Sequence, residues 1–130
     1  MGVLQRLAED ASVDAGYRPR MTEEQKRTAK LLRLANAAAR EVEQVDRLRR
    51  LLRQRERQAR MLRREPKLQI GLAAEIAQLV AEEEAAVRAM ARSLAVLDRF
   101  IVGQGLAVDA DALIGTVLEF RAARRRRFGY

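Results

Sequence analysis

Arginine side chains recur at three- and four-residue steps along one stretch of the chain. They are Arg47, Arg50, Arg53, Arg57, Arg60 and Arg64. On a single helix this spacing places them in one stripe. Because guanidinium groups form forked hydrogen bonds with phosphates and carboxylates alike, the stripe predicts binding of a phosphate-bearing or acidic partner. The alternative is a solvated helix face whose arginines pair with the glutamates at residues 82–84.

A second basic group lies close to the C-terminus. It comprises Arg121, Arg124, Arg125, Arg126 and Arg127. Two aromatic residues follow it, Phe128 and Tyr130. Their rings could stack on unpaired bases beside a funnel of arginines. The alternative is a frayed, disordered C-terminus.

The residue types that most catalytic sites need are missing. The 130 residues include no His and no Cys, which excludes imidazole acid–base chemistry, thiolate nucleophiles and almost every transition-metal site. The chain has no Gly-rich phosphate loop, and the glutamates at residues 82–84 have no partner base. We therefore expect no enzymatic activity, no catalytic residues, no metal and no cofactor.

The net charge of +8 is distributed in blocks along the chain. Residues 40–67 carry a surplus of +6, residues 68–119 carry −5, and residues 121–130 carry +5. This segregation favours an oriented contact with an acidic partner, and it also allows the acidic block to pair with the basic one.

Hydrophobic periodicity indicates two long helices that would position the arginines. No Gly or Pro occurs between Thr22 and Pro66, and a capping box at residues 22–25 marks the start of a helix of about 43 residues. A second periodic series predicts a helix over residues 68–102. Its apolar stripe is too wide for one neighbour, so we expect it to contact at least two helices.

The short connection around Pro66 makes these helices antiparallel neighbours. If the turn centres on residue 67, facing residue numbers add to about 134. The break at residues 103–105 precedes a third helix, capped by Asp109 or Asp111. That helix could return along the hairpin and bring its basic end to the level of residues 47–53, or it could swing out and join another subunit.

The expected fold is therefore all-α. It is a long, coiled-coil-like antiparallel hairpin that a C-terminal helix completes into a three-helix bundle, with a short amphipathic N-terminal helix added. The expected division is residues 1–20 for the N-terminal helix and linker, 21–120 for the helical bundle and 121–130 for the basic tail.

These features favour a non-catalytic assembly or adaptor subunit, which binds partner proteins or self-associates and has a basic face for an acidic partner. We expect a homo-oligomer or a subunit of a larger complex. The alternative is an accessory protein that binds nucleic acid without sequence specificity through the arginines. No run is long and apolar enough for a membrane span, and the first ten residues lack the continuous apolar stretch of a secretory signal, so a cytoplasmic location is expected.

Overall fold

The computed structural model describes residues 20–128, and in that range the protein is all-helical, with no strand. Its helices are α2 (Glu23–Met61), α3 (Pro66–Gly103) and α4 (Ala110–Phe128). The short N-terminal helix expected before residue 20 lies outside the described residues, as does Tyr130. The chain divides into two compact units, Met1–Lys30 and Leu31–Tyr130, and the packing described below belongs to the second.

The start of α2 confirms the predicted capping box. The backbone amide of Thr22 donates to Gln25 Oε1 at 2.9 Å, and the amide of Gln25 donates to Thr22 Oγ1 at 3.1 Å. Glu23 and Glu24 occupy the first turn, where the positive end of the helix dipole favours acidic side chains. These reciprocal bonds satisfy amides that have no partner within the helix.

The turn between α2 and α3 comes slightly earlier than the sequence predicts. Helix α2 ends at Met61, and residues 62–65 form the turn, closed by a hydrogen bond of 2.9 Å from the amide of Glu65 to the carbonyl of Leu62. Pro66 takes the first position of α3, where its missing amide hydrogen costs no hydrogen bond. The proline therefore begins the second helix rather than ending the first.

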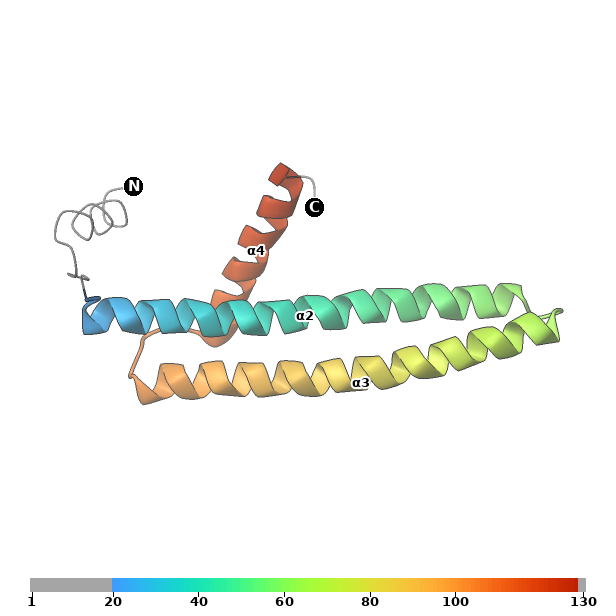
Figure 1. Ribbon diagram of the computed structural model, residues 1–130, viewed down its shortest axis with the longest axis horizontal. Helices are drawn as coiled ribbons and strands as arrows, with labels where there is room; N and C mark the ends of the chain where they lie inside the picture. Colours follow the sequence, from blue (N-terminus) through green and yellow to red (C-terminus); the bar gives the residue numbers. More distant parts are fainter. Residues whose placement is uncertain (1–19, 129–130) are drawn as a thin grey trace, which may run out of the picture. The chain divides into compact units, whose positions relative to one another are not determined.

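Ion pairs across the hairpin show its register. Arg49 Nε lies 3.0 Å from Glu83 Oε1, and Arg55 Nε lies 2.7 Å from Glu75 Oε1. The residue numbers of these pairs add to 132 and 130, close to the expected 134 and lower because the turn is earlier. The antiparallel hairpin is confirmed, and Figure 1 shows α3 alongside α2.

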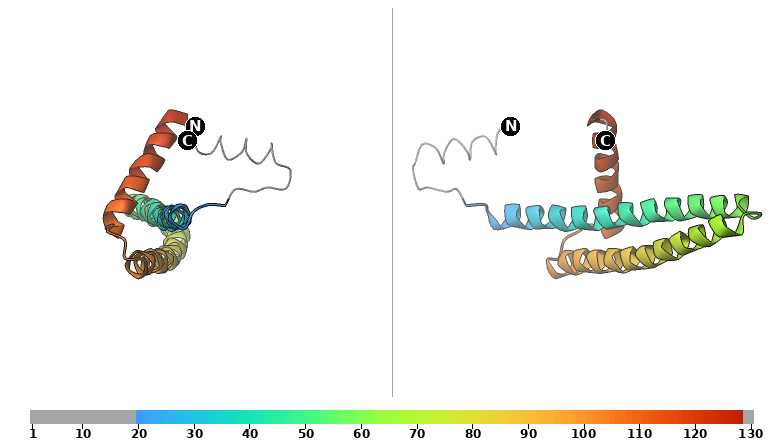
Figure 2. Two further views of the ribbon diagram at one scale, coloured as in Figure 1. Left: turned by 90° about the vertical axis from the view of Figure 1, so that its left-hand side faces the viewer. Right: turned by 45° about the vertical axis from the view of Figure 1, so that its right-hand side comes forward.

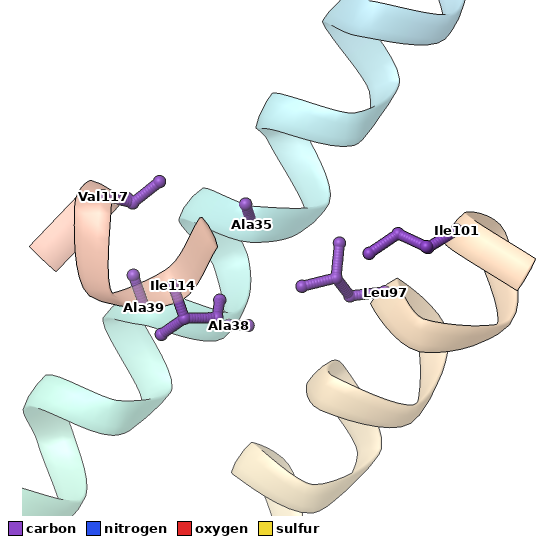
Figure 3. Close-up of a cluster of buried hydrophobic side chains, with 7 residues drawn as sticks. All are labelled: Ala35, Ala38, Ala39, Leu97, Ile101, Ile114 and Val117. Atoms are coloured by element: carbon purple, nitrogen blue, oxygen red, sulfur yellow. The ribbon is translucent and has the colours of Figure 1, made fainter. Parts of the chain in front are cut away.

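Two hydrophobic clusters hold the helices together. Nearer the turn, Val45 and Leu48 of α2 pack against Leu79 and Ala86 of α3. The other cluster joins all three helices and combines three alanines of α2 with two residues each from α3 and α4: Ala35, Ala38, Ala39, Leu97, Ile101, Ile114 and Val117. Figure 3 shows the alanines between the larger side chains of the two neighbouring helices.

The connection to α4 begins with a tight helix end. The amide of Leu106 donates to the carbonyl of Ile101 at 3.0 Å, and that of Gly105 donates to Val102 at 3.1 Å. Gly105 has φ +62°, a left-handed conformation that glycine adopts at little cost. Leu106 also packs against the three-helix cluster. The predicted break at residues 103–105 thus turns the chain back onto its own hairpin.

Helix α4 packs on the hairpin but does not run along it. The views in Figures 1 and 2 show α4 crossing α2 steeply and extending away from the hairpin. The wide apolar stripe of α3 meets both other helices only near Leu97 and Ile101. Ile70 and Val102, on the outer side of α3, are 71% and 72% exposed. The sequence left two courses open for the third helix, a return along the hairpin or a swing away to another subunit; α4 packs on its own hairpin but crosses it instead of running along it.

No helix within residues 20–128 is long and apolar enough to cross a membrane. The described helices carry charged residues throughout their length.

Truncating the central residue of the three-helix cluster should weaken the whole fold. Leu97 has no exposed surface, so Leu97→Ala should lower the free energy of unfolding by about 3 kcal/mol because it leaves a cavity. The matched control is Val96→Ala, at the neighbouring position that is 42% exposed, with an expected change under about 0.5 kcal/mol. Urea denaturation followed by circular dichroism measures both. Equal effects of the two substitutions would contradict the packing described here.

Candidate functional site

The arginines predicted to form a stripe are exposed to solvent. Arg47, Arg50, Arg53, Arg57 and Arg60 lie on α2, and Arg64 lies in the turn that follows it. Five of the six therefore share a helix, and Arg64 continues the series beyond its end.

The hairpin acids pair with other arginines. Glu83 pairs with Arg49 and Glu75 pairs with Arg55, and neither arginine belongs to the stripe. Within residues 20–128, no carboxylate lies in ion-pair contact with any of the six stripe arginines. Arg47 instead donates to the side-chain oxygen of Gln44. The alternative in which the glutamates at residues 82–84 neutralise the stripe is therefore not what the structure shows.

The basic residues near the C-terminus are helical. Helix α4 continues through Phe128, so residues 124–127 point in successive directions around its axis. Arg124, Arg125, Arg126 and Arg127 are all exposed. The guanidinium carbon of Arg127 lies 5.5 Å from the centroid of the Phe128 ring, within the range of a cation–π contact. The proposed stacking partner Phe128 is 56% exposed.

A glutamate of α2 anchors the basic part of α4. Arg121 Nε donates to Glu43 Oε1 at 2.9 Å, and a second nitrogen of Arg121 lies 2.8 Å from the same oxygen. Arg125 pairs with the other carboxylate oxygen, Oε2. The Glu43 side chain is only 20% exposed. One carboxylate thus holds two guanidinium groups, so the contact keeps a surplus of one positive charge.

This anchor joins the basic regions of α2 and α4 in one surface. An open groove of about 550 Å³ lies between the helices, and its charged lining comprises Arg40, Glu43, Asp46, Arg47, Arg50, Arg121 and Arg125. A neighbouring groove of about 540 Å³ is lined by Arg47, Arg50, Arg53 and Arg57 with Leu51 and Gln54. Because Arg47 and Arg50 line both grooves, the two are continuous. We call the arginines of these two grooves the arginine surface.

Two residues that line these grooves, Arg40 and Glu43, were not singled out from the sequence. Arg40 was missed because it lies outside the regular three- and four-residue series. Glu43 was missed because its partners are 78 and 82 residues away. The predicted approach of the basic end of α4 to residues 47–53 is seen at Arg47 and Arg50, although α4 reaches them by crossing the hairpin.

The surface is suited to electrostatic recognition. Guanidinium groups from two helices face a shared groove, where each can donate two parallel hydrogen bonds to a phosphate or carboxylate. Across the described part of the chain, no group of three or more Asp or Glu side chains is placed to hold a metal ion. Because guanidinium groups of both helices face the groove, they can bind an anion there and orient it.

Comparison of the chain with protein-family models, with curated proteins and with solved structures gave no match. The geometry of the arginine surface therefore carries the functional argument.

Removing the charge of the anchoring glutamate should loosen the basic end of α4. Glu43→Gln keeps the shape of the side chain but removes the negative charge that pairs with Arg121 and Arg125. We expect a loss of about 1 kcal/mol in stability and faster amide hydrogen exchange in the last turns of α4. The matched control is Glu119→Gln, on the exposed surface of α4, which forms no ion pair with any residue of the range 20–128. Unchanged exchange in Glu43→Gln would contradict the anchoring role.

Proposed function

We propose that the protein is a non-catalytic helical adaptor or assembly subunit that holds an acidic partner on its arginine surface. The observation that carries the proposal is the division of roles among the arginines of α2. Arg49 and Arg55 pair with Glu83 and Glu75 of α3, whereas the stripe arginines are exposed and form no ion pair within residues 20–128. The fold therefore leaves its positive charge concentrated on one face.

The shape of that face supports contact with a partner. Two helices that are far apart in sequence meet at Glu43 and place arginines on both sides of a groove. The three-helix cluster holds these helices in place, so the helix backbones that carry the arginines need little reordering before a partner binds. Such preorganisation lowers the entropic cost of association.

Exposed apolar side chains support a protein partner or self-association. Ile70, Val80, Val96 and Val102 of α3 are between 39% and 72% exposed. None of them packs against the two hydrophobic clusters. Apolar side chains that a long helix leaves in solvent can contact a partner helix or a second copy of the chain.

The second candidate function is binding of nucleic acid without sequence specificity. It is favoured by the length of the arginine series on α2. From Arg47 to Arg57 the helix rises by about 15 Å, which spans several successive phosphates of one strand. The arginines of α4 add contacts at one end of this series. In this case the affinity would depend steeply on salt.

Charge reversal on the arginine surface tests the first proposal. We expect Arg50→Glu, Arg53→Glu and Arg57→Glu together to weaken binding of fluorescent poly-glutamate at least roughly tenfold, since three favourable charges become unfavourable. The matched control reverses Arg88, Arg92 and Arg99, which are exposed on α3, and has the same net charge. Fluorescence anisotropy measures the affinities. Equal losses in both variants, or no binding by the unaltered protein at low salt, would contradict the proposal.

The same variants, assayed with duplex DNA at two salt concentrations, test the second candidate. Nucleic-acid binding predicts that the affinity falls with salt and that the slope becomes shallower in the variant of Arg50, Arg53 and Arg57. Absence of a DNA complex at low salt would exclude the second candidate. A complex that tolerates the three substitutions would show that this part of the surface is not its site.

Self-association is tested by light scattering. We expect a mass above the 14.7 kDa of one chain, and we expect Ile70→Ser with Val80→Ser to lower it because both side chains are exposed on α3. Phe120→Ser, which alters an exposed apolar residue of α4, is the control. A monomer mass for the unaltered protein would contradict self-association.

A further inference from the structure

The tip of the hairpin exposes apolar side chains. Met61, at the end of α2, is 84% exposed, and Leu68, in the first turn of α3, is 55% exposed. Both line an open groove of about 560 Å³, whose other apolar lining residues are Leu62, Gly71 and Leu72. These two side chains contribute little to the hydrophobic clusters of the fold, so their exposure at the tip needs another explanation.

Cations surround the apolar tip. Arg60, Arg63, Arg64 and Lys67 are exposed within eight residues of chain, and Glu65 is the single acid among them. In the part of the chain that the structure describes, none of these four cations forms an ion pair. We call these four cations, with Met61 and Leu68, the tip surface.

The position of the tip surface favours a broad, flat partner. The turn between α2 and α3 lies at the end of the hairpin away from α4, as Figure 1 shows. The tip surface is therefore well separated along the hairpin from the crossing of α4, and the groove that Met61 and Leu68 line is open rather than enclosed. A planar surface can meet such an end without a clash with the arginine surface.

The combination of residue types identifies the chemistry of this partner. A phosphate backbone would use the cations but would leave Met61 and Leu68 in water. The boundary between headgroups and acyl chains in an anionic bilayer offers phosphates to cations and an apolar layer to inserted side chains. Because weak apolar anchoring becomes effective when a polybasic patch accompanies it, the tip surface has the two components that such binding needs.

We propose that the tip surface binds an anionic phospholipid bilayer, with Met61 and Leu68 inserted at the headgroup boundary and the four cations in contact with lipid phosphates. The proposal does not depend on the proposed function of the arginine surface. Met61, Leu68, Arg63 and Lys67 lie outside that surface, so variants at these positions test the tip surface alone.

Vesicle sedimentation of the full chain tests the proposal. We expect binding to mixed phosphatidylserine–phosphatidylcholine vesicles, little binding to pure phosphatidylcholine vesicles, and weaker binding as salt rises. Met61→Ser with Leu68→Ser should lower the vesicle affinity roughly tenfold. The matched control, Val108→Ser with Phe120→Ser, removes two exposed apolar side chains away from the tip. Arg63→Glu with Lys67→Glu should lower binding at least as much, with Arg92→Glu and Arg99→Glu as its control.

A variant that binds vesicles more strongly provides an independent check, because misfolding would weaken binding and could not strengthen it in this way. A Cβ atom added at Gly71 would have no neighbour within 4 Å, so the backbone accepts a side chain there, and Gly71→Leu adds an apolar group beside the groove. It should strengthen vesicle binding several-fold, whereas Gly103→Leu, where the added Cβ also has no neighbour, should not.

Three outcomes would overturn the proposal. The first is an absence of sedimentation with phosphatidylserine vesicles at low salt. The second is equal binding by Met61→Ser with Leu68→Ser and by its control, which would mean that no apolar side chain of the tip inserts. The third is that the protein with all four tip cations binds duplex DNA but does not bind vesicles. That result would assign the tip surface to a nucleic-acid partner.

Discussion

The close contact of three alanines with two helices is the constraint on which the rest of this structure depends. Ala35, Ala38 and Ala39 of α2 have no exposed surface. Side chains this small let neighbouring backbones approach, so α2 contacts Leu97 of α3 and Ile114 of α4 at the same level (Figure 3). A larger residue at any of these positions would overpack the junction and displace one neighbour. The alanines therefore determine where α4 crosses the hairpin.

The position of α4 in turn determines the electrostatics of the molecule. By crossing α2 at the alanines, α4 places Arg121 and Arg125 beside Glu43. Two acids of α3, Glu83 and Glu75, pair with Arg49 and Arg55 across the hairpin. The stripe arginines of α2, which do not take part in these pairs, form a continuous basic face, and α4 extends this face at one end. The segregation of charge along the sequence thus becomes a segregation of charge in space.

The hairpin could be predicted from the sequence because its signals are local. The capping box at Thr22, the periodic apolar residues of α2 and α3, and the glycines at residues 103–105 each act over a few residues, and all of them are found in the structure. The register was predicted to within a few residues because the short connection around Pro66 determines where the second helix folds back on the first, and the pairs of Glu83 and Glu75 with α2 agree with it.

The direction of α4 could not be predicted in the same way. An alanine in a periodic series indicates a buried face, but it does not show that a second helix contacts that face. Glu43 resembles any other exposed acid of a long helix until its partners, 78 and 82 residues away, are brought to it. For the same reason, the sequence could not distinguish the arginines that pair across the hairpin from those that stay exposed. The partners of Glu43 and the pairing of each arginine depend on the direction in which the side chain leaves the helix axis where the helices pack together.

The central claim is that α4 is fixed on the hairpin of its own chain, so that arginines of two helices form one surface. Because the chain has no cysteine, spin labels on Gln54→Cys and Ala123→Cys, two exposed positions of α2 and α4, would be specific. Double electron–electron resonance, with labelled protein diluted into unlabelled protein, measures the distance between them within one chain. The account predicts a single narrow distance distribution. A broad distribution would show that α4 moves independently of the hairpin, and it would contradict the account.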